Sequence, residues 1–185
     1  MFQKQNGSEY NKHIHLSVGL QPLMISDVNM HPIAERFFAL NDEQKRLVHI
    51  SMASIALTSW RRHVSSESVP LKYQETVAGT FQVVDVELPA EALEAVISGV
   101  RSNIAKRYLE PICAMQDDDW EFNDDAEMAY YAIYNTYRKY IEGKEIDNWL
   151  IVNQSLSSLG KDADIMSPLK LAVDSAEKSE NKKNT

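Results

Sequence analysis

The sequence predicts a mainly α-helical, single-domain bundle of about five helices with a minor two-stranded β element. Apolar residues recur at intervals of three and four along most of the chain, and residues that begin or end helices stand beside these runs. The 185 residues are 44% apolar and 25% charged, as in a folded globular protein. A chain of this length buries about 70% of its unfolded surface, so one hydrophobic core is expected without disulfides or a metal.

Two segments have the pattern of β-strands. From His13 to Gln21, apolar residues alternate with polar or small ones, which is typical of a half-buried strand. Residues 80–88 are rich in valine and phenylalanine and are the candidate partner strand. Two strands alone are marginally stable, so they are expected to pack on helices.

The first predicted helix begins after Asn41, which forms a capping-box pattern with Gln44. An apolar run follows: Leu47, Val48, Ile50, Met52, Ala53, Ile55, Ala56, Leu57 and Trp60. These residues surround most of the helix, which predicts a central position in the core. Arg61, Arg62 and His63 suit the negative end of the helix dipole and mark its expected end. Residues 64–79 are predicted to form a long connection.

Two further helices follow. Pro89 is expected to begin one of them, with a single apolar face that continues to Tyr108 and an end or kink at Pro111. Asp124, with Glu127 three residues later, predicts the start of the next, which runs to about Gly143.

Five of the eight tyrosines lie in eleven residues of this third helix: Tyr130, Tyr131, Tyr134, Tyr137 and Tyr140. The face expected to be buried contains Tyr130 and Tyr137, which leaves Tyr131 and Tyr134 off to the sides. Tyrosine packs its ring while its hydroxyl reaches water or a partner, so these two side chains suit a binding surface. Core packing is the alternative.

The C-terminal region is predicted to contain two more helices. Asp147 is the expected cap of the fourth and Gly160 its stop, and Ser167-Pro168 begins a short fifth helix. The predicted domain comprises residues 1–176. Residues 177–185 have nothing to bury and are expected to be a disordered tail.

The most distinctive segment lies just before the third helix. Seven of the eleven residues from Asp117 to Glu127 are acidic, and none is basic. Consecutive carboxylates repel one another, and burying one without a partner costs free energy or forces protonation. The segment is therefore expected to face water, a cation or a basic partner. The predicted partner-binding residues are Asp117, Asp118, Asp119, Trp120, Glu121, Phe122, Asp124, Asp125, Tyr131 and Tyr134.

Familiar catalytic patterns are missing from the sequence. We find no zinc-protease helix, di-iron repeat, glycine-rich phosphate loop or Gly-x-Ser-x-Gly elbow. An EF-hand reading of the acidic segment fails, because Phe122 stands where the loop needs glycine and Met128 where it needs glutamate. The single cysteine, Cys113, lies in an apolar stretch and is expected to be a buried thiol. We therefore expect neither an enzyme nor a cofactor or metal.

The net charge of −8 argues against nucleic acid as a ligand and favours a basic protein partner. The sequence has neither an apolar leader nor a run long enough to span a bilayer, so a cytoplasmic protein without membrane contact is expected. Small acidic domains of this kind include many inhibitors and toxin-neutralising immunity proteins. The hypothesis is that the acidic segment occludes the basic cleft of a toxin or nuclease.

Two alternatives stay open at this point. The carboxylates from Asp117 to Asp125 would serve a metal-assisted hydrolase if the fold supplied their missing partners. A self-associating structural protein, a homodimer through the tyrosine face, is the other alternative.

Overall fold

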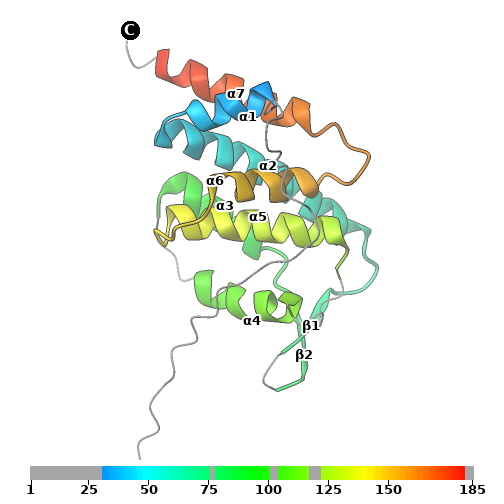
Figure 1. Cartoon of the computed structure of the whole chain (residues 1–185). Coiled ribbons are helices and arrows are strands. Elements are labelled where there is room, and N and C mark those ends of the chain that lie inside the picture. The colour runs from blue at the N-terminus through cyan, green and yellow to red at the C-terminus, as the bar shows by residue number, and fades with distance from the viewer. Residues whose placement is uncertain (1–30, 76–77, 101–103, 117–121, 182–185) are drawn as a thin grey trace, which may run out of the picture. The chain divides into compact units, whose positions relative to one another are not determined.

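The structure is a computed structural model that describes residues 31–75, 78–100, 104–116 and 122–181 (Figure 1). These residues contain seven helices and one antiparallel pair of strands, so the mainly α class is confirmed. The elements are α1 (Pro32–Ala39), α2 (Asp42–Ser66), β1 (Lys72–Gln74), β2 (Phe81–Val83), α3 (Leu88–Ser98), α4 (Ile104–Gln116), α5 (Asp124–Tyr140), α6 (Asn148–Ser157) and α7 (Met166–Asn181). They belong to one of two compact units, residues 31–185; the first unit, residues 1–30, lies outside the described part.

Helix α2 begins as the sequence predicts. The Asn41 side chain accepts a hydrogen bond from the Gln44 backbone N–H at 2.9 Å, and the Gln44 side chain accepts one from the Asn41 backbone N–H at 3.0 Å. This capping box satisfies two backbone donors that the first turn leaves unpaired. The helix continues to Ser66, past the predicted end at His63, and is therefore roughly 37 Å long.

The buried apolar side chains form two clusters where the sequence predicts one core. The first cluster gathers residues of α2, α3, α4 and α5, and Trp60 is its largest side chain. The second gathers residues of α1, α2, α6 and α7 around Phe37. Helix α2 contributes Ala53, Ala56 and Trp60 to the first cluster and Val48 and Met52 to the second. Its predicted central position is confirmed.

The predicted helix from Pro89 to Pro111 is two helices. Helix α3 ends at Ser98, and Gly99 follows it in the left-handed region with a φ of 70°, where glycine has no steric cost. Helix α4 then continues through Pro111, although the proline ring removes a backbone hydrogen bond to the Arg107 carbonyl. Cys113 on α4 is partly buried rather than fully buried.

The small sheet differs from the predicted one in its strands. Strand β2 pairs with β1, with Lys72 opposite Val83 and Gln74 opposite Phe81. Strand β1 lies in the segment that the sequence predicts as a connection. Strand β2 ends at Val83, and Leu88 already belongs to α3, so the predicted strand 80–88 is too long. The predicted partner strand 13–21 lies outside the described residues.

The C-terminal helices follow the predicted order. Asp147 caps α6 by accepting a hydrogen bond from the Leu150 backbone N–H at 2.9 Å. Helix α5 ends at Tyr140, slightly before the predicted Gly143. Helix α7 continues to Asn181, so its last turns occupy the start of the segment predicted as a disordered tail. The Glu177 carboxylate there forms an ion pair with Arg36 of α1, at 2.5 Å.

Helix α1 is not predicted from the sequence. It packs against α7, and His31 caps it by accepting a hydrogen bond from the Ile33 backbone N–H. Among the described helices, none has the length and apolar character needed to cross a membrane.

Candidate functional site

The predicted acidic surface is only partly within the described residues. Residues 117–121, with Asp117, Asp118, Asp119, Trp120 and Glu121, lie outside them. The structure places the other five predicted residues, Phe122, Asp124, Asp125, Tyr131 and Tyr134. They divide into two exposed carboxylates and three aromatic side chains that contact the chain's own core.

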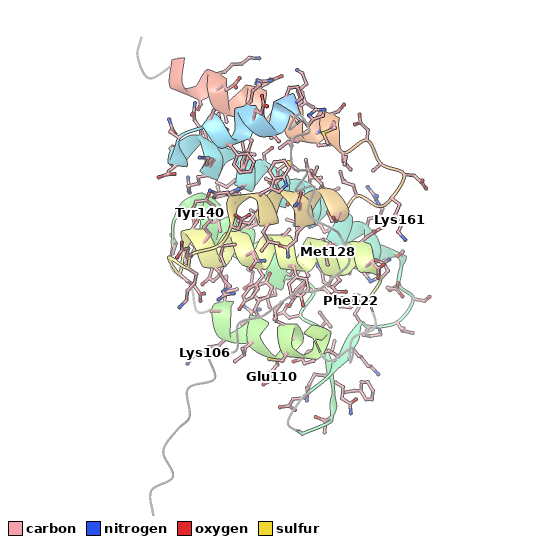
Figure 2. The ribbon with its side chains drawn as sticks, in the orientation of Figure 1. Lys106, Glu110, Phe122, Met128, Tyr140 and Lys161 are labelled. Carbon is pink, nitrogen blue, oxygen red and sulfur yellow. The ribbon has the colours of Figure 1, made fainter. Side chains whose placement is uncertain are left out.

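Phe122 fixes the approach to α5 rather than standing free in solvent (Figure 2). Its ring meets Trp60 edge-on at 5.1 Å between centroids and His63 edge-on at 5.5 Å. Edge-to-face aromatic pairs of this kind add about 0.5–1.5 kcal/mol to the burial itself. The end of the acidic segment is therefore attached to the C-terminal part of α2.

Asn123 adds a second attachment and starts α5 one residue earlier than the predicted cap, Asp124. Its side-chain oxygen accepts a hydrogen bond from the Ala126 backbone N–H at 2.9 Å. This bond orients the amide, so its nitrogen donates to His63 Nδ1 at 3.3 Å. His63 Nδ1 is then the acceptor in this contact, and His63 Nε2 is buried with no hydrogen-bond partner in the described part of the chain.

Replacing Asn123 with alanine is expected to lower the free energy of unfolding by about 1 kcal/mol, because the α5 cap and the His63 contact are lost together. Urea denaturation followed by circular dichroism measures the change. The matched control is Asn153→Ala, since Asn153 is exposed on α6. Equal stability of the two variants would show that Asn123 does not hold the start of α5.

Asp124 and Asp125 are the first two residues of α5, and both are exposed. Carboxylates are favoured in the first turn by the positive end of the helix dipole. Among the described residues, neither is in an ion pair: Arg36, Arg46, Arg107 and Arg138 pair with other carboxylates. The two charges therefore face solvent.

The fold brings the α6–α7 connection beside Asp125. A Cβ atom placed on Gly160 would lie 3.0 Å from the Asp125 carboxylate, so the α6–α7 connection passes directly beside it. Gly160 has a φ of 89°, which favours glycine on its own account. Lys161 and Asp162 follow and are both exposed, so the connection carries one charge of each sign. We call Asp124 and Asp125 the acidic surface.

The tyrosines of α5 are used mainly inside the protein. Tyr131 is only 4% exposed, so its expected position at the side of the helix is wrong. Burial raises the pKa of its hydroxyl well above the ordinary value. Tyr134 is partly buried and stacks on Tyr108 of α4 at 4.7 Å, and the Arg138 guanidinium lies 5.4 Å from the Tyr134 ring. Tyr130 and Tyr134 thus pack against Tyr108 of α4, and Tyr140 packs against α2.

The described residues offer no ligand set for a metal ion. Among them, no group of three or more histidine, cysteine, aspartate or glutamate side chains is close enough to hold one. Asp124 and Asp125 therefore gain no partners from the described part of the fold. The metal-assisted alternative receives no support from these residues.

A buried histidine that the sequence analysis does not single out joins three helices. His49 of α2 is fully buried; its Nε2 lies 3.0 Å from the Asn148 carbonyl oxygen, and its Nδ1 lies 2.6 Å from the Tyr140 hydroxyl. A carbonyl only accepts, so Nε2 carries the proton, and the Tyr140 hydroxyl donates to Nδ1. Tyr140 lies beside an open pocket of about 350 Å³ between α2, α5 and α6.

This pair has the wrong acidity for proton transfer. Burial lowers the pKa of His49 to about 4, and burial raises the pKa of Tyr140 well above its ordinary value. A phenol that ionises so reluctantly does not give its proton to so weak a base. The pair is a structural connection between helices, and a lone histidine in an apolar run gives no sequence signal for it.

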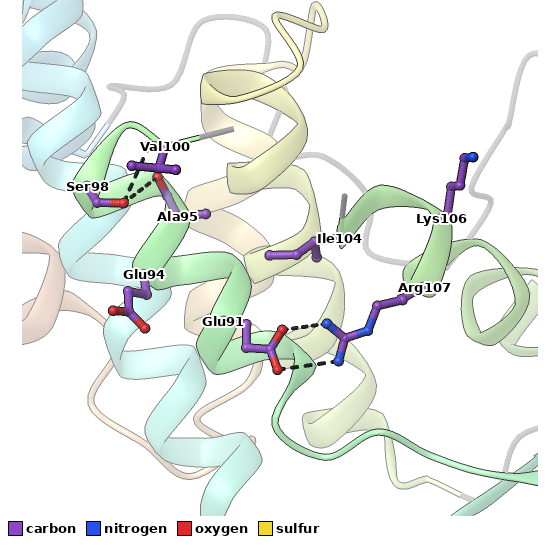
Figure 3. A pocket seen from close by; sticks show the side chains of 8 residues that line it. All are labelled: Glu91, Glu94, Ala95, Ser98, Val100, Ile104, Lys106 and Arg107. Carbon is purple, nitrogen blue, oxygen red and sulfur yellow. Dashed lines mark hydrogen bonds and ion pairs between the residues drawn. The ribbon is translucent and has the colours of Figure 1, made fainter. Parts of the chain in front are cut away.

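A larger groove lies between α3 and α4, with a volume of about 660 Å³ (Figure 3). Its apolar side chains are Ala95, Val100 and Ile104. Charged residues of both signs line the same groove. The sequence pattern does not predict the groove, because it predicts one continuous helix where the structure has α3 and α4.

Comparisons of the chain with protein-family models, with curated proteins and with solved structures find no match.

Proposed function

We propose that this chain is a protein-binding protein of the inhibitor or immunity type, which holds a basic partner on the acidic surface at the beginning of α5. The observation that carries the proposal is the exposure of Asp124 and Asp125 without an ion pair among the described residues. The net charge of −8 supports a partner of opposite sign. The single cysteine, which leaves no internal disulfide to form, suits the cytoplasmic location that is part of the proposal.

The attachment of the segment favours binding over a passive solvated surface. Phe122 and Asn123 fix the start of α5 to α2, so the carboxylates of the first turn are held in place before a partner arrives. A preorganised charged surface loses less conformational entropy on binding. Opposite potentials also accelerate the encounter.

The mechanism in this proposal is occlusion. The carboxylates occupy a basic cleft that otherwise receives the phosphate backbone or another anionic substrate of the partner. The described aromatic side chains are engaged in the chain's own core, so the proposal rests on charge and assigns Phe122, Tyr131 and Tyr134 a supporting role. It assigns no catalytic step to this chain.

The test is charge reversal with a matched control. In Asp124→Lys/Asp125→Lys, capture of a basic protein from the native host's lysate is expected to weaken at least tenfold, a loss of about 1.4 kcal/mol or more. The control is Asp42→Lys/Glu43→Lys, because these residues occupy the same first two positions of α2 and cost the same helix-dipole interaction. The control is expected to retain capture, and wild-type capture is expected to weaken with added salt.

Two results would contradict the proposal. One is equal capture by both double variants, which would place the interface elsewhere. The other is capture that does not respond to salt, since exposed carboxylates act through a screened charge interaction. Circular dichroism of both variants confirms that they are folded.

A further inference from the structure

The groove between α3 and α4 has an internal ion pair that removes one charge of each sign. The Arg107 guanidinium binds the Glu91 carboxylate, with one contact at 2.5 Å (Figure 3), and also binds Asp85. These three groups, two carboxylates and one guanidinium, keep one net negative charge and connect α4 to α3 and to the residues before it. A second molecule could bind these groups only by breaking the ion pairs between them.

Two charged residues of the groove remain unused. Glu94 of α3 and Lys106 of α4 are both exposed, and neither takes part in an ion pair within the described ranges. They belong to the two different helices that bound the groove. Among the described lining residues, the α3 wall thus has one exposed carboxylate outside any ion pair, and the α4 wall has one such cation.

One large exposed apolar side chain lines the groove, and a second lies nearby on α3. Val100 lines the groove and is 61% exposed; Ile97, three residues before it and outside the lining, is 57% exposed. Large apolar side chains that gather at a groove with a charged rim are typical of a protein contact. The Gly99 turn between them presents Val100 beyond the end of α3.

We propose that this groove is the contact surface of a homodimer with two-fold symmetry. In such an interface each copy uses the same surface. If one residue of the first copy contacts a different residue of the second copy, the same contact occurs again with the two copies exchanged. One free anion and one free cation on opposite walls satisfy this requirement: Glu94 of each copy faces Lys106 of the other. A second copy necessarily carries the complementary charges, and Ile97 and Val100 supply the apolar contact between them.

This surface is separate from the acidic surface. It involves α3 and α4, whereas the proposed binding of a basic partner uses the beginning of α5. The tyrosine face, which the sequence suggests for self-association, is not needed. Failure of either proposal would leave the other standing, because their tests change different residues.

The experiment measures the dimer dissociation constant by sedimentation equilibrium of the full chain. Glu94→Lys and Lys106→Glu are each expected to weaken the wild-type dimer at least tenfold, because like charges then face each other twice. The double variant, Glu94→Lys with Lys106→Glu, is expected to recover dimerisation, since the swap restores opposite charges. An equal mixture of the two single variants is expected to form a heterodimer, in which both contacts again join opposite charges.

The matched control is a pair of exposed charges on the α5–α6 connection, Lys144→Glu and Glu145→Lys, which are expected to leave the dissociation constant unchanged. Circular dichroism checks that each variant is folded. A wild-type chain that is monomeric at its highest soluble concentration would overturn the proposal and leave the groove to another occupant. A dimer weakened by the single variants but recovered neither by the double variant nor by the mixture would overturn it too.

Discussion

Replacing Trp60 with alanine is expected to lower the free energy of unfolding by about 3–5 kcal/mol. Trp60 is fully buried, and its ring lies 5.1 Å from Phe122 and 5.2 Å from Tyr130. Its indole N–H donates to the Val86 carbonyl oxygen at 2.9 Å. Truncation therefore removes aromatic contacts, leaves a cavity and strands a buried acceptor at once.

Urea denaturation followed by circular dichroism measures this loss. The matched control is Trp149→Ala, because Trp149 is only partly buried and contacts Phe37 and Phe38 in the second cluster. The control substitution is expected to lower the free energy of unfolding by a clearly smaller amount. If Trp60→Ala were no more destabilising than Trp149→Ala, the first cluster would not depend on Trp60 as its central side chain.

The second large effect is a fall in stability as the pH is lowered from about 6.5 to about 4. Burial lowers the pKa of His49 from 6.5 to about 4, whereas the unfolded chain exposes the imidazole. Over this range the unfolded state binds a proton that the folded state does not, so stability decreases as the pH falls. His49 alone is expected to lower the free energy of unfolding by about 3 kcal/mol. This loss is complete once the pH lies below the pKa of His49 in both the folded and the unfolded state.

His49→Gln separates this contribution from carboxylates that protonate in both proteins. Glutamine does not titrate, and its amide can donate to Asn148 and accept from Tyr140, as the imidazole does. Urea denaturation at a series of pH values is expected to give the variant a smaller loss than the wild type between pH 6.5 and 4. Parallel curves for the two proteins would mean that His49 is not held neutral in the folded state.

The parts of the fold that the sequence predicts best depend on neighbouring residues. The Asn41 and Gln44 capping box and the Asp147 cap are satisfied within one turn, so no distant contact decides them. The break at Gly99 is harder to predict, because apolar residues keep helical spacing on both sides of it. Strand β1 is three residues, and its pairing with β2 is a contact between chain segments that its own sequence does not encode strongly.

The candidate site shows the same limit. That Asp124 and Asp125 are exposed could be predicted, because adjacent carboxylates in a helix's first turn favour solvent. That Tyr131 is buried could not, since helix α5 packs against several helices and buries more than one stripe of its surface. The position of the α6–α7 connection beside Asp125 depends on the tertiary fold, so the sequence pattern does not predict it.

Helix α2 is a shared wall of both apolar clusters, with Val48 and Met52 facing one and Ala53, Ala56 and Trp60 facing the other. Neither cluster retains a complete boundary without it, so the two cannot behave as independent folding units. A substitution that unfolds α2 would expose apolar side chains of both clusters, whereas unfolding of α1 would expose those of the second cluster only. Helix α2 therefore couples the two clusters directly, and the packing of α5 on α6, with its Asn135–Gln154 hydrogen bond, joins them a second time.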